Sequence, residues 1–113
     1  MSEADRPRHE ALIIISRVSV RPGRREEFRA LIPQLCRAAE DEPGTLVFSF
    51  QHERENPDDY WLVEMYRNAE AHVLHRRNSV DPVRAQLEDL FVTWPHRRYC
   101  VPIAAKGFGP PVT

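Results

Sequence analysis

Three polar side chains lie among apolar neighbours in the middle of the sequence, and their types suit acid–base chemistry. Glu64 and Tyr66 belong to the run DDYWLVEMY, and His75 closes the following segment AHVLH. A carboxylate on an otherwise apolar strand must be paired, solvated or functional, because burying an isolated charge is costly. A neutral imidazole can take a proton from a phenol or an enol near neutral pH. The trio therefore predicts a site in which His75 is the base and Glu64 and Tyr66 position the substrate.

Each member of the trio also has a structural interpretation that the sequence leaves open. His75 could be a solvated helix histidine beside two arginines. Glu64 could form an ion pair with an arginine across the sheet, and Tyr66 could be a core residue with a satisfied hydroxyl.

A metal site is not expected. His72 and His75 are spaced like ligands on one helix, but no third ligand has suitable spacing. The sequence has no zinc-ligand spacing, no glycine-rich phosphate loop and no GxSxG motif. Cys36 and Cys100 belong to no CxxC pair, so we expect free, reduced, buried thiols in a cytoplasmic protein.

The elements that must position these residues follow from hydrophobic periodicity. Apolar and β-branched runs predict strands over about 11–20, 45–53, 59–67 and 97–105. A stripe from Phe28 to Ala39 predicts a first helix, with a kink or a break at Pro33. Asn68 is predicted to cap a short helix ending near Arg77, and a second helical piece capped by Ser79 or Asp81 follows.

The order strand, helix, strand, strand, helix, strand predicts an α+β fold, the ferredoxin-like split βαβ arrangement with an antiparallel sheet. We expect one domain over residues 11–105, a flexible leader over 1–10 and an irregular tail over 106–113. The helices cover one face of the sheet, and a pocket is expected between them. Its predicted substrate-binding residues are Ser16, Phe48, Phe50, Leu62, His72 and Phe91. Each of these phenylalanines, like Trp94, could also be ordinary core.

The other face of the sheet would carry an apolar patch formed by Trp61, Val63 and Met65. At about 25 cal/mol per Å², leaving such side chains in water forfeits several kcal/mol. We therefore predict a homodimer that packs sheet against sheet, with a partly exposed monomer as the alternative.

Composition excludes several functions. The chain has 113 residues and a formal net charge of −1, so no field favours nucleic acid or an anionic membrane. No apolar run approaches the roughly 18 residues of a membrane span, and the N-terminal residues lack a secretory signal.

Several of these features together resemble the antibiotic biosynthesis monooxygenase family. They are Pro22-Gly23 after the first strand, Glu42-Pro43-Gly44 before the second, the LVEMY pattern and His75. The resemblance covers roughly residues 11–105 and implies a dimeric α/β barrel. It also implies a cofactor-free monooxygenase that oxidises small phenolic, quinol-like or polyketide-like aromatics with O2. Tyr66 is a departure, because the family more often has tryptophan there.

Relatives on this fold include haem-degrading enzymes, isomerases and cyclases, so the fold alone does not decide the chemistry. Ser16 and Tyr66 stand where haem-degrading relatives have asparagine and tryptophan, which disfavours haem. The leading hypothesis is a homodimeric, cofactor-independent oxygenase. The alternatives are a non-oxidative isomerase or cyclase using the same pocket, and a small-molecule-binding dimer without turnover.

Overall fold

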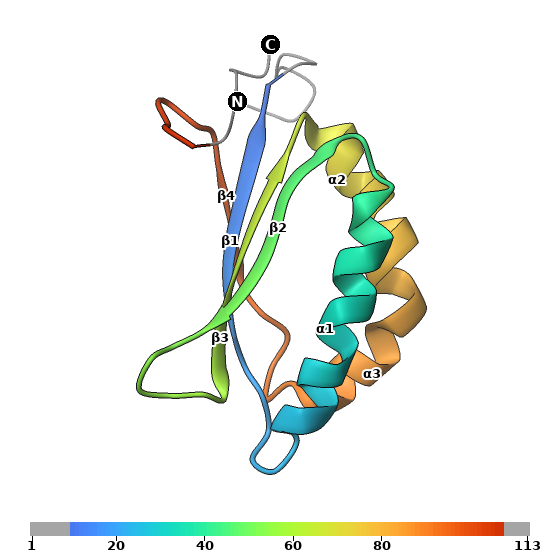
Figure 1. Cartoon of the computed structure of the whole chain (residues 1–113), viewed down its shortest axis with the longest axis vertical. Coiled ribbons are helices and arrows are strands. Elements are labelled where there is room, and N and C mark those ends of the chain that lie inside the picture. The colour runs from blue at the N-terminus through green and yellow to red at the C-terminus, as the bar shows by residue number, and fades with distance from the viewer. Residues whose placement is uncertain (1–9, 108–113) are drawn as a thin grey trace.

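The computed structural model describes residues 10–107, in which one antiparallel sheet has all its helices on one face (Figure 1). The main elements are β1 (Leu12–Ser19), α1 (Arg25–Glu40), β2 (Thr45–His52), β3 (Asp59–Tyr66), α2 (Ala69–His75), α3 (Arg84–Leu90) and β4 (Arg97–Cys100). Between α2 and α3 the chain forms a π-helix (Arg76–Val80) and a 3-10 helix (Asp81–Val83). Most of the predicted leader and tail, residues 1–9 and 108–113, lies outside the described residues.

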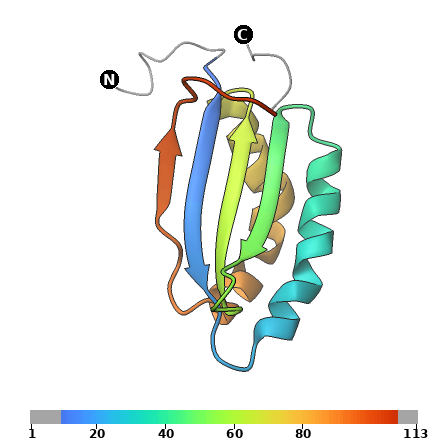
Figure 2. The same ribbon diagram turned by 60° about the vertical axis from the view of Figure 1, so that its left-hand side comes forward.

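The four strands lie in the order β2-β3-β1-β4, and every neighbouring pair is antiparallel (Figure 2). This is the predicted ferredoxin-like α+β fold. The register places Ser16 on β1 opposite Leu62 on β3 and Arg97 on β4. Three separate strands therefore bring these residues to one part of the sheet.

The core lies between the sheet and the helices, as the alternation of the strands predicts. Along β1 the side chains of Ile14, Ser16 and Val18 are buried, and they share the helix-facing side. Phe28 of α1 is fully buried and makes edge-on ring contacts with Tyr60 and Phe91, at centroid distances of 4.8 and 5.3 Å. Such aromatic contacts join α1 to the sheet.

Two predicted boundaries differ from those in the structure. The helix α1 is not broken at Pro33 but continues to Glu40, because its buried residues on both sides of the proline hold it on the core. The fourth strand ends at Cys100 and not near residue 105. Pro102 lacks an N–H and cannot extend the ladder with β1.

The second helical region begins as predicted, because the Asn68 side chain accepts a hydrogen bond from the Ala71 N–H at 2.9 Å. It does not end near Arg77, since the π-helix and the 3-10 helix carry the chain into α3 without a gap. Neither Ser79 nor Asp81 is a side-chain cap. The Ser79 hydroxyl instead donates to Glu42 at 2.9 Å.

The face of the sheet that bears no helix carries both apolar and charged side chains, and not all of its apolar residues are exposed. Trp61 is 40% exposed, but Met65 is 5% exposed, so Met65 does not belong to an open patch as predicted. Arg17 lies on this face and pairs with Glu53 and Asp59, each at 3.0 Å. Glu64 points to the other face and has no pairing with Arg17.

Cys36 and Cys100 are free thiols, but they are half-buried where full burial was predicted. Burial raises the pKa of the Cys36 thiol, and the charge of Glu40 adds to this effect. Within residues 10–107, no helix is both long enough and apolar enough to cross a membrane.

Candidate functional site

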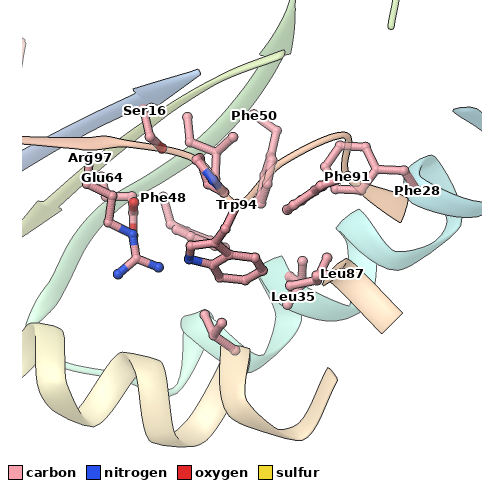
Figure 3. A pocket seen from close by; sticks show the side chains of 13 residues that line it. Ser16, Phe28, Leu35, Phe48, Phe50, Glu64, Leu87, Phe91, Trp94 and Arg97 are labelled. Carbon is pink, nitrogen blue, oxygen red and sulfur yellow. The ribbon is translucent and has the colours of Figure 1, made fainter. Parts of the chain in front are cut away.

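A cavity lies between the sheet and the helices, where the sequence predicts a pocket (Figure 3). About 40 Å³ of it is open to the centre of a water-sized sphere. A single water needs roughly 10–15 Å³ on this measure, so the enclosed space holds about three waters or one small aromatic ring, and a larger ring system must extend through its open side. The lining is largely aromatic and aliphatic and consists of Ser16, Phe28, Leu35, Phe48, Phe50, Leu62, Glu64, Val80, Leu87, Phe91, Trp94, Pro95 and Arg97.

Polar groups gather at one end of this cavity. Ser16, Glu64 and Arg97 lie at that end, and Phe28 and Leu87 lie at the other (Figure 3). The three polar residues come from β1, β3 and β4, so the register of the sheet fixes their spacing. A ligand with an apolar body and one polar end would match this arrangement of polar and apolar side chains.

Glu64 and Tyr66 are joined by a short hydrogen bond. The Tyr66 hydroxyl donates to Glu64 Oε1 at 2.5 Å, and both residues are buried. Burial, and then the charge of Glu64 and its hydrogen bond, raise the pKa of Tyr66 far above its usual range. Tyr66 therefore remains a hydrogen-bond donor at neutral pH, and it holds the one carboxylate among the residues that line the cavity.

His75 lies directly behind Glu64 and is fully buried. Its ring packs against Phe48, with the ring centroids 4.5 Å apart. Its Nδ1 lies 2.7 Å from Glu42 Oε1, and its Nε2 lies 4.0 Å from Glu64 Oε1. Among the described residues, Nε2 of His75 is the buried side-chain nitrogen or oxygen that has no hydrogen-bond partner. A neutral imidazole that donates through Nδ1 to Glu42 presents a bare Nε2 toward Glu64.

Glu42, which the sequence analysis did not place in the site, holds the far side of His75. Its Oε1 accepts from His75 and from the Thr45 hydroxyl at 2.8 Å, and its Oε2 accepts from Asn78 at 2.7 Å and from Ser79. Burial opposes ionisation of Glu42, but these four hydrogen bonds outweigh it and lower the pKa of the carboxyl. The π-helix supplies Asn78 and Ser79, and such turns are frequent at functional sites.

Gly44 permits the close packing that brings Glu42 under His75. A Cβ atom at this position would lie 2.5 Å from the Cβ of Ala71 in α2. The start of β2 and the helix that carries His75 therefore approach more closely than any larger residue allows. This contact gives the sequence Glu42-Pro43-Gly44 a physical role in building the site.

Six of the nine predicted site residues line the cavity, and Tyr66, His75 and His72 do not. Glu64 and the predicted substrate-binding residues other than His72 line the cavity, with Tyr66 and His75 directly behind Glu64. His72 is buried outside the cavity lining, with its ring centroid 5.0 Å from Tyr66 and 5.9 Å from Tyr99. Burial, and then the charges of Arg76 and Arg97, lower its pKa to about 4, so it is neutral at pH 7.

Arg97 is a second residue of the site that the sequence analysis did not place there. Arg97 is half-buried and lines the cavity, whereas its neighbour Arg98 is exposed. The alternation of side chains along a strand could have indicated this difference, because consecutive residues point to opposite faces. Trp94 lines the same cavity and is covered by Arg84, whose guanidinium carbon lies 4.1 Å from the ring centroid.

Residues 10–107 contain no group of three or more His, Cys, Asp or Glu side chains that could hold a metal ion. The groups at the site are therefore a carboxylate, a phenol, an imidazole and a guanidinium. Such groups can move a proton and stabilise the charge that remains.

Comparison with known proteins agrees with the resemblance seen in the sequence. The sequence model of the family described as antibiotic biosynthesis monooxygenase matches residues 11–85. Among proteins with curated functions, none is similar enough in sequence to match.

Solved structures share the fold over nearly their whole length. A protein from Chloroflexus aurantiacus J-10-fl, provisionally named an antibiotic biosynthesis monooxygenase, is 26% identical with a TM-score of 0.71, and the match covers 88% of this chain and 99% of that chain. A protein from Nitrosomonas europaea with the same provisional name is 16% identical with a TM-score of 0.79, covering 90% and 99%. Rv0793 from Mycobacterium tuberculosis is 22% identical with a TM-score of 0.77, covering 86% and 99%. The two more distant likenesses bear on the fold alone.

Proposed function

The chain belongs to the antibiotic biosynthesis monooxygenase family, and we propose that it is a cofactor-independent monooxygenase acting on a small phenolic or quinol-like aromatic. The observation that carries the proposal is the buried network of Glu64, Tyr66 and His75 at the polar end of an aromatic-walled cavity. The provisional name of the Chloroflexus aurantiacus relative supports the same reaction class.

The first step is removal of a proton from the substrate hydroxyl. Glu64 reaches the cavity and takes this proton, and Tyr66 orients the carboxylate through its hydrogen bond. A small turn of Glu64 closes the 4.0 Å gap to His75 Nε2, which then receives the proton. The resulting imidazolium is stabilised by Glu42, which lies 2.7 Å from Nδ1. His75 is thus the final base, although Phe48 and Glu64 stand between it and the substrate.

The second step is oxidation by O2, in which the substrate itself supplies the electrons. The electron-rich anion gives one electron to O2, and the radical pair combines to form a C–O bond. Cleavage of the O–O bond then leaves a carbonyl on the substrate and releases water. A methylene carbon that becomes a carbonyl loses four electrons, which match the reduction of O2 to one water and one carbonyl oxygen. An anthrone has such a methylene carbon. In a hydroquinone a ring C–H becomes C–OH and the two phenols become carbonyls, which also removes four electrons and releases one water.

A non-oxidative isomerase or cyclase is the second candidate, because the same proton transfer serves enolisation without O2. His75 lies between the carboxylates of Glu42 and Glu64, so a proton that it takes from Glu64 can also be returned to Glu64. Turnover of a hydroxyaromatic substrate under anaerobic conditions would favour this candidate over the monooxygenase.

We also propose that two copies pair through the sheet face that bears no helix. Trp61 is 40% exposed there, and Ile13, Ile15 and Val63 on the same face are only half-buried. Val63→Glu should shift the protein to a monomer in sedimentation velocity. Leu74→Glu, which changes a 60% exposed residue on the helical side, should not. A wild-type protein that sediments as a monomer at high concentration would contradict the pairing.

Oxygen uptake tests the reaction. Anthrones and hydroquinones are supplied to the wild-type protein, Glu64→Gln and His75→Ala, with Glu70→Gln and Leu74→Ala as matched controls on the exposed side of α2. General-base residues contribute roughly 100- to 10,000-fold, so the two site variants should lose most of the uptake and the controls none. Equal uptake by His75→Ala and wild type would remove His75 from the mechanism.

A further inference from the structure

Arg97 is a cationic side chain at the polar end of the cavity, and it has no partner in the described structure. Within residues 10–107 it donates no hydrogen bond and forms no ion pair, whereas Arg17, Arg24 and Arg25 all contact carboxylates. A guanidinium that lines a largely apolar cavity and has no carboxylate partner is available to bind an anionic group. The charge of Arg97 acts on nearby groups. It helps to lower the pKa of His72, although burial of His72 and the charge of Arg76 have larger effects.

Ser16 offers a second donor beside Arg97. The two residues are paired across β1 and β4, and Ser16 is 3% exposed. The Ser16 hydroxyl also makes no side-chain hydrogen bond among residues 10–107. Two donors without partners therefore share the polar end with one acceptor, Glu64 (Figure 3). This set matches a ligand oxygen that is protonated when it arrives and anionic afterwards.

We propose that Arg97 and Ser16 form an anion subsite that holds the ionised oxygen of the substrate after Glu64 has taken its proton. In this step the substrate O–H bond breaks, the proton moves to the Glu64 carboxylate and the electron pair stays on oxygen. While the proton is on Glu64, a phenolate or an enolate replaces the carboxylate as the anion beside the guanidinium. When the proton passes to His75, the carboxylate and the substrate anion face the guanidinium and the imidazolium, so the total charge of the site is unchanged. Donors that are already in place can stabilise such developing charge.

This inference rests on the proposed function and narrows its substrate class. The substrate presents an acidic hydroxyl, phenolic or enolic, at one end of a compact apolar ring system. Ethers of the same rings enter the cavity but are not activated there, because they have no proton to give. If the charged group of a ligand lies far from the ring, that group cannot contact Arg97 while the ring occupies the cavity.

The binding of para-nitrophenol to the full chain tests the subsite directly, because its absorption reports whether the bound phenol is ionised. Wild-type protein should bind the anionic form at a pH below the pKa of the free probe. Arg97→Gln should weaken this binding by about tenfold to a hundredfold, the usual loss for a hydrogen bond to a charged group. Arg97→Lys should restore part of the affinity, and Arg37→Gln, at an exposed position on α1, should match wild type. Circular dichroism verifies that each variant is folded.

The uncharged ether para-nitroanisole provides the matched ligand, and its affinity should be the same for wild type and Arg97→Gln. Equal affinity and equal ionisation of para-nitrophenol in Arg97→Gln, Arg37→Gln and wild type would overturn the subsite. Oxygen uptake separates this inference from the proposed function. Uptake that needs Glu64 but not Arg97 removes the subsite and leaves the monooxygenase. Ionisation of the probe that depends on Arg97, without any uptake, supports the subsite and removes the monooxygenase.

Discussion

Replacing Glu42 by glutamine tests how the structure holds His75. Each Glu42 oxygen accepts two hydrogen bonds, Oε1 from His75 and Thr45 and Oε2 from Asn78 and Ser79. Glutamine has one carbonyl oxygen, so in either orientation its NH2 group faces two donors. The hydroxyl of Thr45 or Ser79 can turn to accept, and His75 can accept by changing tautomer, but the NH2 of Asn78 cannot accept. In every arrangement the carboxylate charge that strengthens these bonds is gone. At least one charge-assisted bond is therefore lost, at a cost of about 1.5–3 kcal/mol.

Thermal unfolding followed by circular dichroism measures this cost. For a domain of this size the midpoint should fall by roughly 6–13 °C at pH 7. Glu40→Gln, at an exposed position at the end of α1, is the matched control and should leave the midpoint unchanged. The folded state lowers the pKa of Glu42, so its contribution is present above the unfolded pKa and disappears as pH falls through the folded pKa. The difference between the variants should therefore shrink in acid. Equal midpoints for Glu42→Gln and Glu40→Gln at pH 7 would refute the role assigned to these four hydrogen bonds.

Three further predictions follow from single contacts. Gly44→Ala places a Cβ 2.5 Å from that of Ala71, so urea unfolding should show a loss of about 1–3 kcal/mol, and an unchanged midpoint would contradict the close packing. His72 has a folded pKa of about 4, below its unfolded value of about 6.5, so the unfolded state takes up the proton first as pH falls. The free energy of unfolding of wild type should therefore decrease by up to about 3 kcal/mol as the pH is lowered from about 6.5 to about 4. His72→Gln should show a flatter pH profile, and a profile as steep as that of wild type would exclude His72 as the cause. Tyr66→Phe removes the hydrogen bond to Glu64 and should lower kcat for oxygen uptake about tenfold to a hundredfold with little change in KM, whereas an unchanged kcat would show that Tyr66 only packs.

The sequence predicts the fold well because its signals are local. Alternation along residues 59–67 places Leu62, Glu64 and Tyr66 on one side, and the structure has them on the helix-facing side. Asn68 is recognisable as a cap because a capping side chain bonds within its own turn. The continuous passage from α2 into α3 was missed, since π and 3-10 turns carry no clear periodicity of their own.

The parts of the site that were missed depend on contacts between distant segments. Glu42 meets His75 across 33 positions of sequence, and nothing in their local patterns pairs them. Arg97 was also not identified, although alternation on a strand separates it from the exposed Arg98. Its place in the cavity depends on the pairing of β4 with β1, which brings it opposite Ser16. Both residues reach the site through contacts between segments far apart in the sequence, and local residue spacing does not encode such contacts.

The most direct test of the monooxygenase proposal is the fate of isotopically labelled dioxygen supplied with an anthrone or a hydroquinone, without added metal, flavin or haem. Mass spectrometry of the product should show one labelled oxygen atom with wild-type protein and almost none in the same time with Glu64→Gln. A product that carries no labelled oxygen, or that forms at the same rate with Glu64→Gln, would contradict the proposal that Glu64 begins a cofactor-free oxygenation.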